Sequence, residues 1–558
     1  MPTLDWIGKK AVLNHHREVP YRLLKCDPKL SVGDPGCGNL LVQGDNLVAL
    51  KALLPYYAGQ VKCIYIDPPY NTGDENWVYN DAVNSPEIRT WLGKVVGRES
   101  DDLSRHDKWL CMMYPRLNML RQFLRRDGVL FVSIDENEVA ALRLILDEIF
   151  GHTNSLGTMV WKRRSSSAMR GTPLSIDHEY VLIYAYDVSK ATLYGLQKEI
   201  ESYPLEDANG RYASTDLTVG MGMDQRPGQY YSIKNPRTGK EYPANPERVW
   251  RFFPETMHEV IRDGLIIWPD EADGNMTRPR FKTYYDPNSE KPKPISSWIE
   301  SARANEPSTT VDEEFDIHLL TSGMNQEGGR LLSQILGRKV FAYPKPLSLV
   351  RSLIRAATRE SDLVMDSFAG TGTTGHAVSE LNSEDGGKRN FLLIEVDSAI
   401  AEGITAERLR RVSLGYSITD QKGKARQVKG TGLEFRFCQL GEPLFDSQGR
   451  VSGIVRFVDL AQHVFFAETG EPLTRPPNGK RSPLVGIHNG IAYYLLFNGI
   501  LGDKRPDGGN ILTSAVLREL PSHNGPRVVF GEGCRLGSDR LKRERITFKQ
   551  IPYEIKVS

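Results

Sequence analysis

Two parts of the chain alternate short apolar runs with stretches of helical spacing. In the first part, Leu47, Leu50, Leu53 and Leu54 share one helical face, and we expect Asn46 to cap that helix. The elements predicted there are strand 39–43, helix 46–57, strand 61–66, helix 106–126, strand 129–134 and helix 136–150.

The same rhythm returns after a long interval. The predicted elements of this second part are helix 347–357, strand 362–366, a helix from about 374 and strand 391–396. Strands that alternate with helices favour a parallel sheet covered on both faces. The pattern therefore predicts an α/β fold whose sheet is encoded in two separate halves.

The remaining segments lack this rhythm. Residues 161–340 are rich in Pro, Gly and Tyr, with isolated strand-like pieces at 180–186 and 264–268. A segment of that length is too long for a loop, so we predict an inserted domain. The full predicted division is an N-terminal extension 1–38, a first catalytic half 39–160, the insertion 161–340, a second catalytic half 341–418, a basic linker 419–432 and a C-terminal α+β domain 433–558.

Composition narrows the class of protein. The 558 residues are 40% hydrophobic and 25% charged, which excludes a disordered or fibrous chain. The formal net charge of +1 excludes a polycation that coats nucleic acid, although it leaves room for local basic surfaces. No apolar run of about 18 residues and no signal peptide occur, so we expect a soluble cytoplasmic protein.

The cysteines also bear on the class. Six cysteines form no CxxC pair and have no clustered histidines beside them, so we expect no metal site. Six are too few for a disulfide scaffold in a chain of this length. We therefore predict reduced thiols.

A glycine-rich turn follows the strand 362–366. Its residues are Asp366-Ser-Phe-Ala-Gly-Thr-Gly-Thr-Thr-Gly375, and it opens a helix, which suits a ligand that approaches the backbone closely. Because His376 and not lysine follows the glycines, a phosphate loop is excluded. Glu395 ends the next strand and can accept both hydroxyls of a ribose. A dinucleotide and an adenosyl cofactor both remain possible on this motif alone.

A second motif stands directly after the strand 61–66. Asp67-Pro68-Pro69-Tyr70 combines a rigid backbone, an acceptor carboxylate and an aromatic face. Acceptors suit the two N–H donors of an exocyclic amine, and an aromatic face suits a planar base. Together the two motifs point to a nucleobase amine held toward an electrophilic methyl group.

On these residues the chain resembles the amino-methyltransferases that modify DNA with S-adenosylmethionine. The order of the motifs is similar to the β group, whose permuted Rossmann-like sheet carries a target-recognition insertion. The nearest resemblance is to modification subunits of type III restriction–modification systems. It rests on the sequences of 41–73, 341–354 and 362–397.

The resemblance implies roles for individual residues. Asp67 and the Pro68 carbonyl would accept the adenine N6 amine, with Pro69 in the same rigid turn, and Tyr70 would stack on the flipped base. Asp45 would contact the cofactor's adenine, with helix capping beside Asn46 as the alternative. The remaining implied cofactor residues are Lys345, Pro346, Asp366, Phe368, Ala369, Gly370, Gly372 and Glu395. For Lys345, a solvated surface position is the alternative.

The implied reaction needs no metal. A duplex base must be flipped out to reach such a pocket. In the family, Asp at position 67 goes with adenine and Ser commonly goes with cytosine N4. Alternatives are therefore a cytosine-N4 or RNA enzyme, and a DNA-recognition subunit with little catalytic activity; an NAD enzyme is a more distant one.

Local charge predicts where double-stranded DNA binds. Residues 161–170 carry no acid, and Lys162, Arg163, Arg164 and Arg170 could contact phosphates, with a solvated basic loop as the alternative. A second basic cluster at 535–545 also contains acids and is better interpreted as a solvated helix face. The resemblance implies a homodimer, and a separate ATP-dependent restriction subunit of the helicase–nuclease kind.

Overall fold

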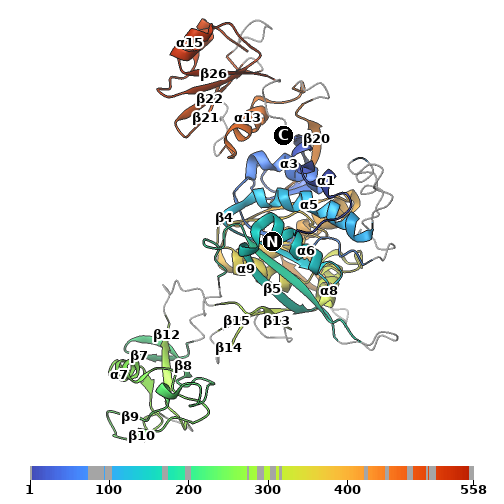
Figure 1. Cartoon of the computed structure of the whole chain (residues 1–558). Coiled ribbons are helices and arrows are strands. Elements are labelled where there is room, and N and C mark those ends of the chain that lie inside the picture. Colours follow the sequence, from blue (N-terminus) through green and yellow to red (C-terminus); the bar gives the residue numbers. More distant parts are fainter. Residues whose placement is uncertain are drawn as a thin grey trace. The chain divides into compact units, whose positions relative to one another are not determined.

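The structure is a computed structural model of the chain (Figure 1). It describes residues 3–72, 94, 104–165, 174–194, 203–272, 276–285, 294–301, 309–312, 317–419, 425–445, 451–473, 482–497, 500–501 and 510–551. The chain divides into two compact units. One consists of Met1–Thr192, Ser297–Ser308 and Thr321–Ser558, and the other of Leu193–Ser296 and Thr309–Leu320.

A parallel sheet forms the centre of the first unit. Its strands run in the order β2-β17-β16-β3-β4, and each pairs in parallel with its neighbours. Their bounds are β2 Leu40–Gln43, β17 Asn390–Glu395, β16 Leu363–Asp366, β3 Val61–Ile66 and β4 Leu124–Ile134. All of β3 is buried, so both faces of the sheet are covered there. The two strands of the second predicted half, β17 and β16, thus lie between strands of the first half within one α/β sheet.

The helices follow the predicted pattern, except that the helix predicted over 106–126 ends at Phe123, because strand β4 begins at Leu124. Contacts join α3 to α5 and α9 to α10. The bounds are α3 Asn46–Tyr57, α5 Arg105–Phe123, α6 Val139–Leu146, α9 Leu347–Ala357, α10 Thr373–Asp385 and α12 Glu407–Leu414. The helix predicted over 136–150 is shorter than expected, because its last turn, Asp147–Gly151, is a π-helix. α3 begins after Asp45, which caps it; Asn46, the predicted cap, is its first residue.

Antiparallel strands extend the sheet beyond β4. β6 pairs with β4 on one side and with β5 on the other. Their bounds are β5 Ser155–Lys162 and β6 His178–Ala185, and β13 Trp298–Ser301 pairs with β5 in parallel. The boundary predicted at residue 161 therefore falls inside β5. Part of the segment that we assigned to the insertion belongs to the central sheet.

The second unit has its own core. Leu217, Trp250, Met257 and Trp268 are buried in it. One sheet runs β11-β12-β8-β7, a two-stranded sheet pairs β9 with β10, and β14 pairs with β15. The bounds are β7 Leu205–Asp207, β8 Gly210–Asp216, β9 Ile233–Lys234, β10 Glu241–Tyr242, α7 Pro254–Arg262, β11 Ile266–Ile267, β12 Arg280–Tyr284, β14 Thr309–Asp312 and β15 Ile317–Ser322.

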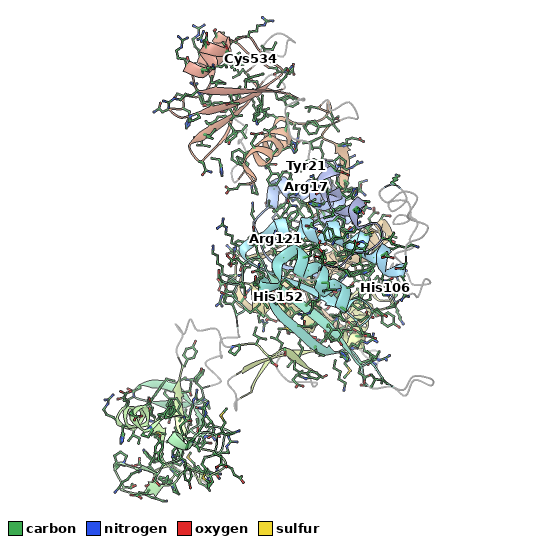
Figure 2. All side chains as sticks on the ribbon, in the orientation of Figure 1. Arg17, Tyr21, His106, Arg121, His152 and Cys534 are labelled. Atoms are coloured by element: carbon green, nitrogen blue, oxygen red, sulfur yellow. A yellow bond between two sulfur atoms is a disulfide. The ribbon has the colours of Figure 1, made fainter. Side chains whose placement is uncertain are left out.

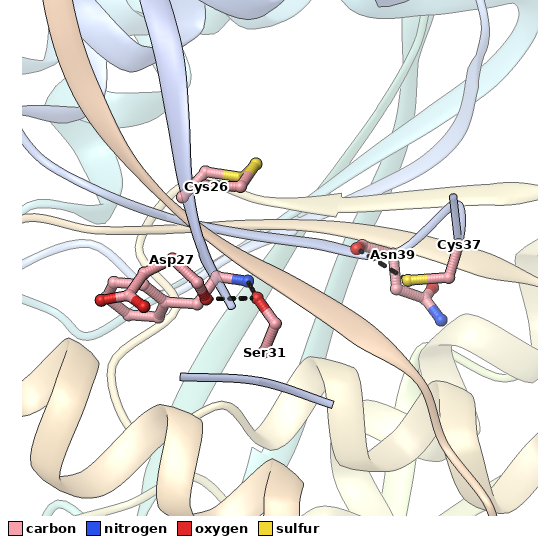
Figure 3. Close-up of a disulfide and its surroundings, with 7 residues drawn as sticks. Cys26, Asp27, Ser31, Cys37 and Asn39 are labelled. Carbon is pink, nitrogen blue, oxygen red and sulfur yellow. Dashed lines mark hydrogen bonds between the residues drawn. A yellow bond between two sulfur atoms is a disulfide. The ribbon is translucent and has the colours of Figure 1, made fainter. Parts of the chain in front are cut away.

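Both ends of the chain contribute to the opposite edge of the central sheet. β1 (Arg22–Val32), from the predicted N-terminal extension, pairs with β20 (Phe435–Pro443), which pairs in parallel with β2. A disulfide joins Cys26 of β1 to Cys438 of β20 (Figure 3). The prediction of reduced thiols is wrong for this pair, because strand pairing places opposite each other two cysteines that are far apart in sequence.

The remaining elements complete the first unit. Strand β18 pairs antiparallel with β19, which lies in the predicted linker, and a sheet in the order β21-β22-β24-β26 lies in the predicted C-terminal domain. The bounds are α1 Lys9–Val12, α2 His15–Glu18, α8 Asn325–Leu336, α11 Ser398–Ile400, β18 Gly415–Thr419, β19 Ala425–Lys429, α13 Phe457–Thr469, β21 Leu484–His488, β22 Ile491–Leu495, β23 Ile511–Leu512, α14 Ser514–Glu519, β24 Arg527–Gly531, β25 Gly533–Cys534, α15 Ser538–Arg543 and β26 Ile546–Gln550. Among the described helices, none is both long and apolar enough to cross a membrane.

The disulfide predicts a cysteine count. Protein purified without reductant and alkylated in denaturant should take up four adducts, at Cys37, Cys63, Cys111 and Cys534, and six after reduction. Intact-mass spectrometry measures this. As a control, Cys26→Ser should take up five adducts with or without reductant, because it frees the Cys438 thiol. Six adducts on unreduced wild-type protein would contradict the disulfide.

Candidate active site

Three neighbouring strands end at the same edge of the sheet. Because β17, β16 and β3 are adjacent and parallel, Glu395, Asp366 and Asp67 come together at their carboxyl ends. In open α/β sheets this edge is where ligands bind. The structure thus brings together the two motifs that the sequence predicts.

The turn after β3 is rigid and anchored. Pro68 and Pro69 are buried, and the indole Nε1 of Trp109 donates a hydrogen bond of 2.6 Å to the Pro69 carbonyl. Asn71 adopts a φ of 60°, and its side chain donates to the buried carboxylate of Glu138. His106, labelled in Figure 2, lies 2.6 Å from the same carboxylate. These contacts hold Asp67 and Tyr70 at the end of the strand.

Lys345 contacts both functional side chains of this turn. It is only 9% exposed, so the alternative of a solvated surface lysine is wrong. Its Nζ lies 3.4 Å from Asp67 Oδ1, donates to the Tyr70 hydroxyl, and is 4.6 Å from the centre of the Tyr70 ring. Lys345 and Pro346, the N-cap of α9, therefore belong to the Asp67–Tyr70 side of the site.

Glu179 completes this cluster. Its Oε2 accepts hydrogen bonds from Lys345 Nζ at 2.6 Å and from the Tyr70 hydroxyl at 3.1 Å. Burial raises the pKa of Asp67 to about 6; the Lys345 ammonium opposes that rise and the Glu179 carboxylate adds to it. The pKa of Asp67 is therefore close to neutral pH, and its carboxyl lies between the Lys345 cation and the Glu179 anion.

Two carboxyl groups accept hydrogen bonds from the glycine-rich turn that follows β16. Glu395 Oε2 accepts from Gly370 N at 2.8 Å, while Asp366 accepts from Phe368 N at 2.9 Å and from the Thr374 hydroxyl at 2.6 Å. Burial raises the pKa of Asp366 and of Glu395 to about 7. Both carboxyls are thus held against the backbone of the turn.

The backbone of this turn requires glycine. Gly370 and Gly372 have φ values of 50° and 76°, and Gly372 caps α10. A Cβ on Gly372 would come within 2.9 Å of Thr405 Cγ2. Ala369 is buried, with its N–H bonded to the Ile394 carbonyl. Side chains larger than hydrogen would distort the turn and fill the space that it encloses.

An orphaned polar atom lies in the same turn. Among the residues that the structure describes, the buried Ser367 hydroxyl oxygen has no hydrogen-bond partner. Phe368 beside it is partly buried and packs against the main core. This turn has an unsatisfied hydroxyl, a glycine backbone that a ligand can approach, and Glu395 beside it at the end of β17. These features fit a polar cofactor that carries a ribose.

Asp45 stabilises the start of helix α3. It caps α3 by accepting from Val48 N at 3.0 Å, and it forms a 2.9 Å ion pair with the buried Arg116. Arg116 also donates to Asn46, whose amide lies 3.4 Å from the Ser367 carbonyl. Helix capping by Asp45, the alternative that we weighed, is confirmed. Contact of Asp45 with a cofactor stays a prediction.

Two of the predicted DNA contacts, Arg163 and Arg164, form ion pairs in the structure. Arg163 forms a 3.4 Å ion pair with Glu179, and Arg164 a 3.6 Å pair with Asp177. Lys162 is the last residue of β5. Arg170 lies outside the described residues. Contact with DNA phosphates stays a prediction for all four, and Arg163 is joined to the catalytic cluster by its ion pair.

Sequence reasoning missed Glu179, Arg116 and Glu138. For Glu179 a signal existed, because this carboxylate directly precedes the largely apolar strand-like piece predicted at 180–186. Acids are almost never buried unless paired, so such a position requires a partner. Among the described residues no group of three or more His, Cys, Asp or Glu is arranged to hold a metal.

Comparison with known proteins decides the family. The pattern of the family described as DNA methylase matches residues 61–407, which include both motifs and the insertion between them. The chain belongs to the DNA methylase family.

Two relatives of this chain are named as Mod subunits. It is 32% identical over 440 residues to the Mod subunit of the type III restriction-modification enzyme StyLTI of Salmonella typhimurium, covering 76% of this chain and 62% of that subunit. It is 30% identical over 509 residues to the EcoPI Mod subunit of Escherichia phage P1, covering 83% of this chain and 74% of that one.

A solved structure is more distant. The cytosine-N4-specific PvuII DNA methyltransferase is 12% identical, with a TM-score of 0.33, covering 67% of this chain and 86% of that one. A similarity at this level carries no conclusion about what the chain acts on.

The left-handed backbone at Gly372 predicts a stability loss when this glycine is replaced. Gly372→Ala should lower the free energy of unfolding by about 1–3 kcal/mol, because a left-handed backbone and the Thr405 contact both oppose a Cβ. Thermal unfolding measures it. Gly329→Ala is a matched control, since that helical glycine has no atom within 4 Å of a new Cβ and should gain stability. Equal melting temperatures for Gly372→Ala and Gly329→Ala would contradict the strain predicted for a side chain at position 372.

The buried carboxyls predict a pH effect on stability. The pKa of Asp366 is about 7 in the folded protein and its ordinary value is 3.8, so its stabilising contribution is complete below about pH 4 and is lost as pH rises through 7. Asp366→Asn lacks this titration. Its melting temperature relative to wild type should therefore rise between pH 5 and pH 8, as scanning fluorimetry measures. A difference that is constant or falls over this range would argue against a raised pKa.

Proposed function

We propose that this chain transfers a methyl group from S-adenosylmethionine to the N6 amine of an adenine flipped out of double-stranded DNA. The supporting observation is the adjacency of two strand ends. β3 delivers the Asp67–Tyr70 turn, and β16, its parallel neighbour, delivers the glycine turn. A base and a methyl donor bound at these two ends would meet at one edge of the sheet.

The Asp67 side of the site suits the amine. An adenine amine is a poor nucleophile because its lone pair is delocalised into the ring. Asp67 and the Pro68 carbonyl are acceptors for its two hydrogens, and accepting both favours a pyramidal nitrogen whose lone pair is available. Alignment for in-line transfer then supplies much of the rate, because the new N–C bond forms as the methyl–sulfur bond breaks. Asp67 stabilises the positive charge that develops on the amine, which then releases one N–H proton to solvent. Tyr70 supplies the aromatic face for the base.

The glycine side of the site suits the cofactor. When bound, S-adenosylmethionine supplies an activated sulfonium methyl group. Gly370 and Gly372 let it approach the backbone, Glu395 stands where ribose hydroxyls would be accepted, and Ser367 offers an unsatisfied hydroxyl. Asp366, Phe368 and Ala369 hold the shape of the turn, because each is buried or bonded to its neighbours.

Adenine is favoured over cytosine by the first letter of the motif. In the resembled family an Asp at position 67 accompanies adenine, and Ser commonly accompanies cytosine N4. A recognition subunit with little activity is disfavoured, because the Asp67–Tyr70 turn and the glycine turn are both intact and adjacent.

We further propose that the chain acts in the cytoplasm as the modification and site-recognition subunit of a type III-like system. Relatives named as Mod subunits support this, and so does the second unit, whose separate core makes it a candidate reader of base edges. Lys162 and Arg164 would contact phosphates beside the flipped base. A homodimer and a separate restriction subunit are the expected partners.

Nucleoside analysis tests the proposed reaction. DNA incubated with the purified chain and S-adenosylmethionine, digested to nucleosides and analysed by mass spectrometry, should contain N6-methyladenine. Asp67→Asn should reduce the yield at least about 100-fold, because it replaces one carboxylate oxygen with an N–H donor and removes the negative charge. Asp5→Asn, at an exposed aspartate, is the control and should not reduce it. N4-methylcytosine without N6-methyladenine would refute the adenine assignment.

A further inference from the structure

Glu179 is a buried carboxylate outside both motifs. It lies in β6, and its side chain is 3% exposed. Two cations and one phenol surround it: Lys345 Nζ at 2.6 Å, Arg163 at 3.4 Å and the Tyr70 hydroxyl at 3.1 Å. A buried carboxylate is costly unless it is paired and hydrogen-bonded, so this position implies a task.

One consequence concerns Tyr70. Its hydroxyl donates to Glu179 and accepts from Lys345, so the outer edge of the ring is tethered at two points. The backbone on the other side is held through Trp109 and the Pro69 carbonyl. A ring fixed at both ends offers its face to a planar base without losing rotamer freedom on binding.

The other consequence concerns Asp67. Lys345 Nζ is closer to Glu179, at 2.6 Å, than to Asp67, at 3.4 Å. The ammonium group of Lys345 therefore interacts more strongly with Glu179 than with Asp67. Without the Glu179 charge, Lys345 would be left with Asp67 as its only close anion in the described cluster, and the resulting ion pair would occupy the acceptor that an amine requires.

We propose that Glu179 is a positioning residue that draws Lys345 away from Asp67 and fixes the Tyr70 ring, and so keeps the Asp67 carboxylate available to the amine of the target base. This inference rests on the proposed methyl transfer. Among the described residues, the titratable groups around Asp67 are Lys345 just before α9, Glu179 on β6, Tyr70 in the same turn, Tyr65 on β3 and Asp366 on β16. Of these, Glu179 has a contact with both Lys345 and Tyr70.

The substitution Glu179→Gln removes the negative charge of Glu179 and nearly preserves the size of its side chain. The amide keeps an acceptor for Tyr70 but removes the negative charge, so the pKa of Asp67 should fall for two reasons that act in the same direction. One repelling anion is lost, and Lys345 moves toward Asp67. The pKa is measured by ¹³C NMR on protein labelled at aspartate carboxyls, without cofactor or DNA, with the Asp67 signal assigned by its loss in Asp67→Asn.

Kinetics provide the second readout. In single turnovers at saturating cofactor, Glu179→Gln should slow methyl transfer about tenfold or more, while the Kd for duplex DNA changes less than about twofold. The acidic limb of the rate against pH should move to lower pH with the Asp67 pKa. Glu179→Asp, which restores the charge, should return the Asp67 pKa toward its wild-type value.

The outcomes separate this inference from the proposed function. Glu442→Gln, at an exposed glutamate of β20, is the control and should match wild type in both measurements. An Asp67 pKa that stays unchanged or rises in Glu179→Gln would overturn the positioning role, even if wild-type protein methylates adenine. A wild-type protein that transfers no methyl group would instead overturn the proposed function, and the NMR comparison would still decide whether Glu179 controls Asp67.

Discussion

The organisation of the site depends on the burial of carboxyl groups at the ends of adjacent parallel strands. β16 and β17 each end in an acid and Asp67 directly follows β3; burial raises the pKa of Asp67 to about 6 and of Asp366 and Glu395 to about 7. Such groups persist because hydrogen bonds and cations surround them: backbone N–H groups at the glycine turn, and Lys345 at the other motif. The sheet must place these partners accurately, since an unpaired acid there would destabilise the fold.

Much of this arrangement is predictable from local sequence. The strand Val61–Ile66, the helix Leu347–Ala357 and the glycine turn are found where periodicity and turn residues place them. These features depend on neighbours within a few positions. The joining of two halves into one sheet follows from the order of the motifs, because each half alone has too few strands to bury its faces.

The features that escaped prediction depend on residues far apart in the chain. Lys345 meets Tyr70 across 275 positions and Glu179 across 166, so no local pattern shows that it is buried. Cys26 meets Cys438 only because the N-terminal strand pairs with β20. Asp45 and Asn46 show the reverse case: both are good capping residues, and tertiary contacts with Arg116 determine which one caps α3.

The disulfide gives the first unit an unusual covalent topology. Its two cysteines are 412 positions apart, so the bond closes a ring that contains both motifs and the whole second unit. A protease cut anywhere inside that ring would leave the fragments attached to one another until the bond is reduced. The two halves of the sheet, which the chain encodes on either side of a long insertion, are thus joined independently of the peptide that connects them.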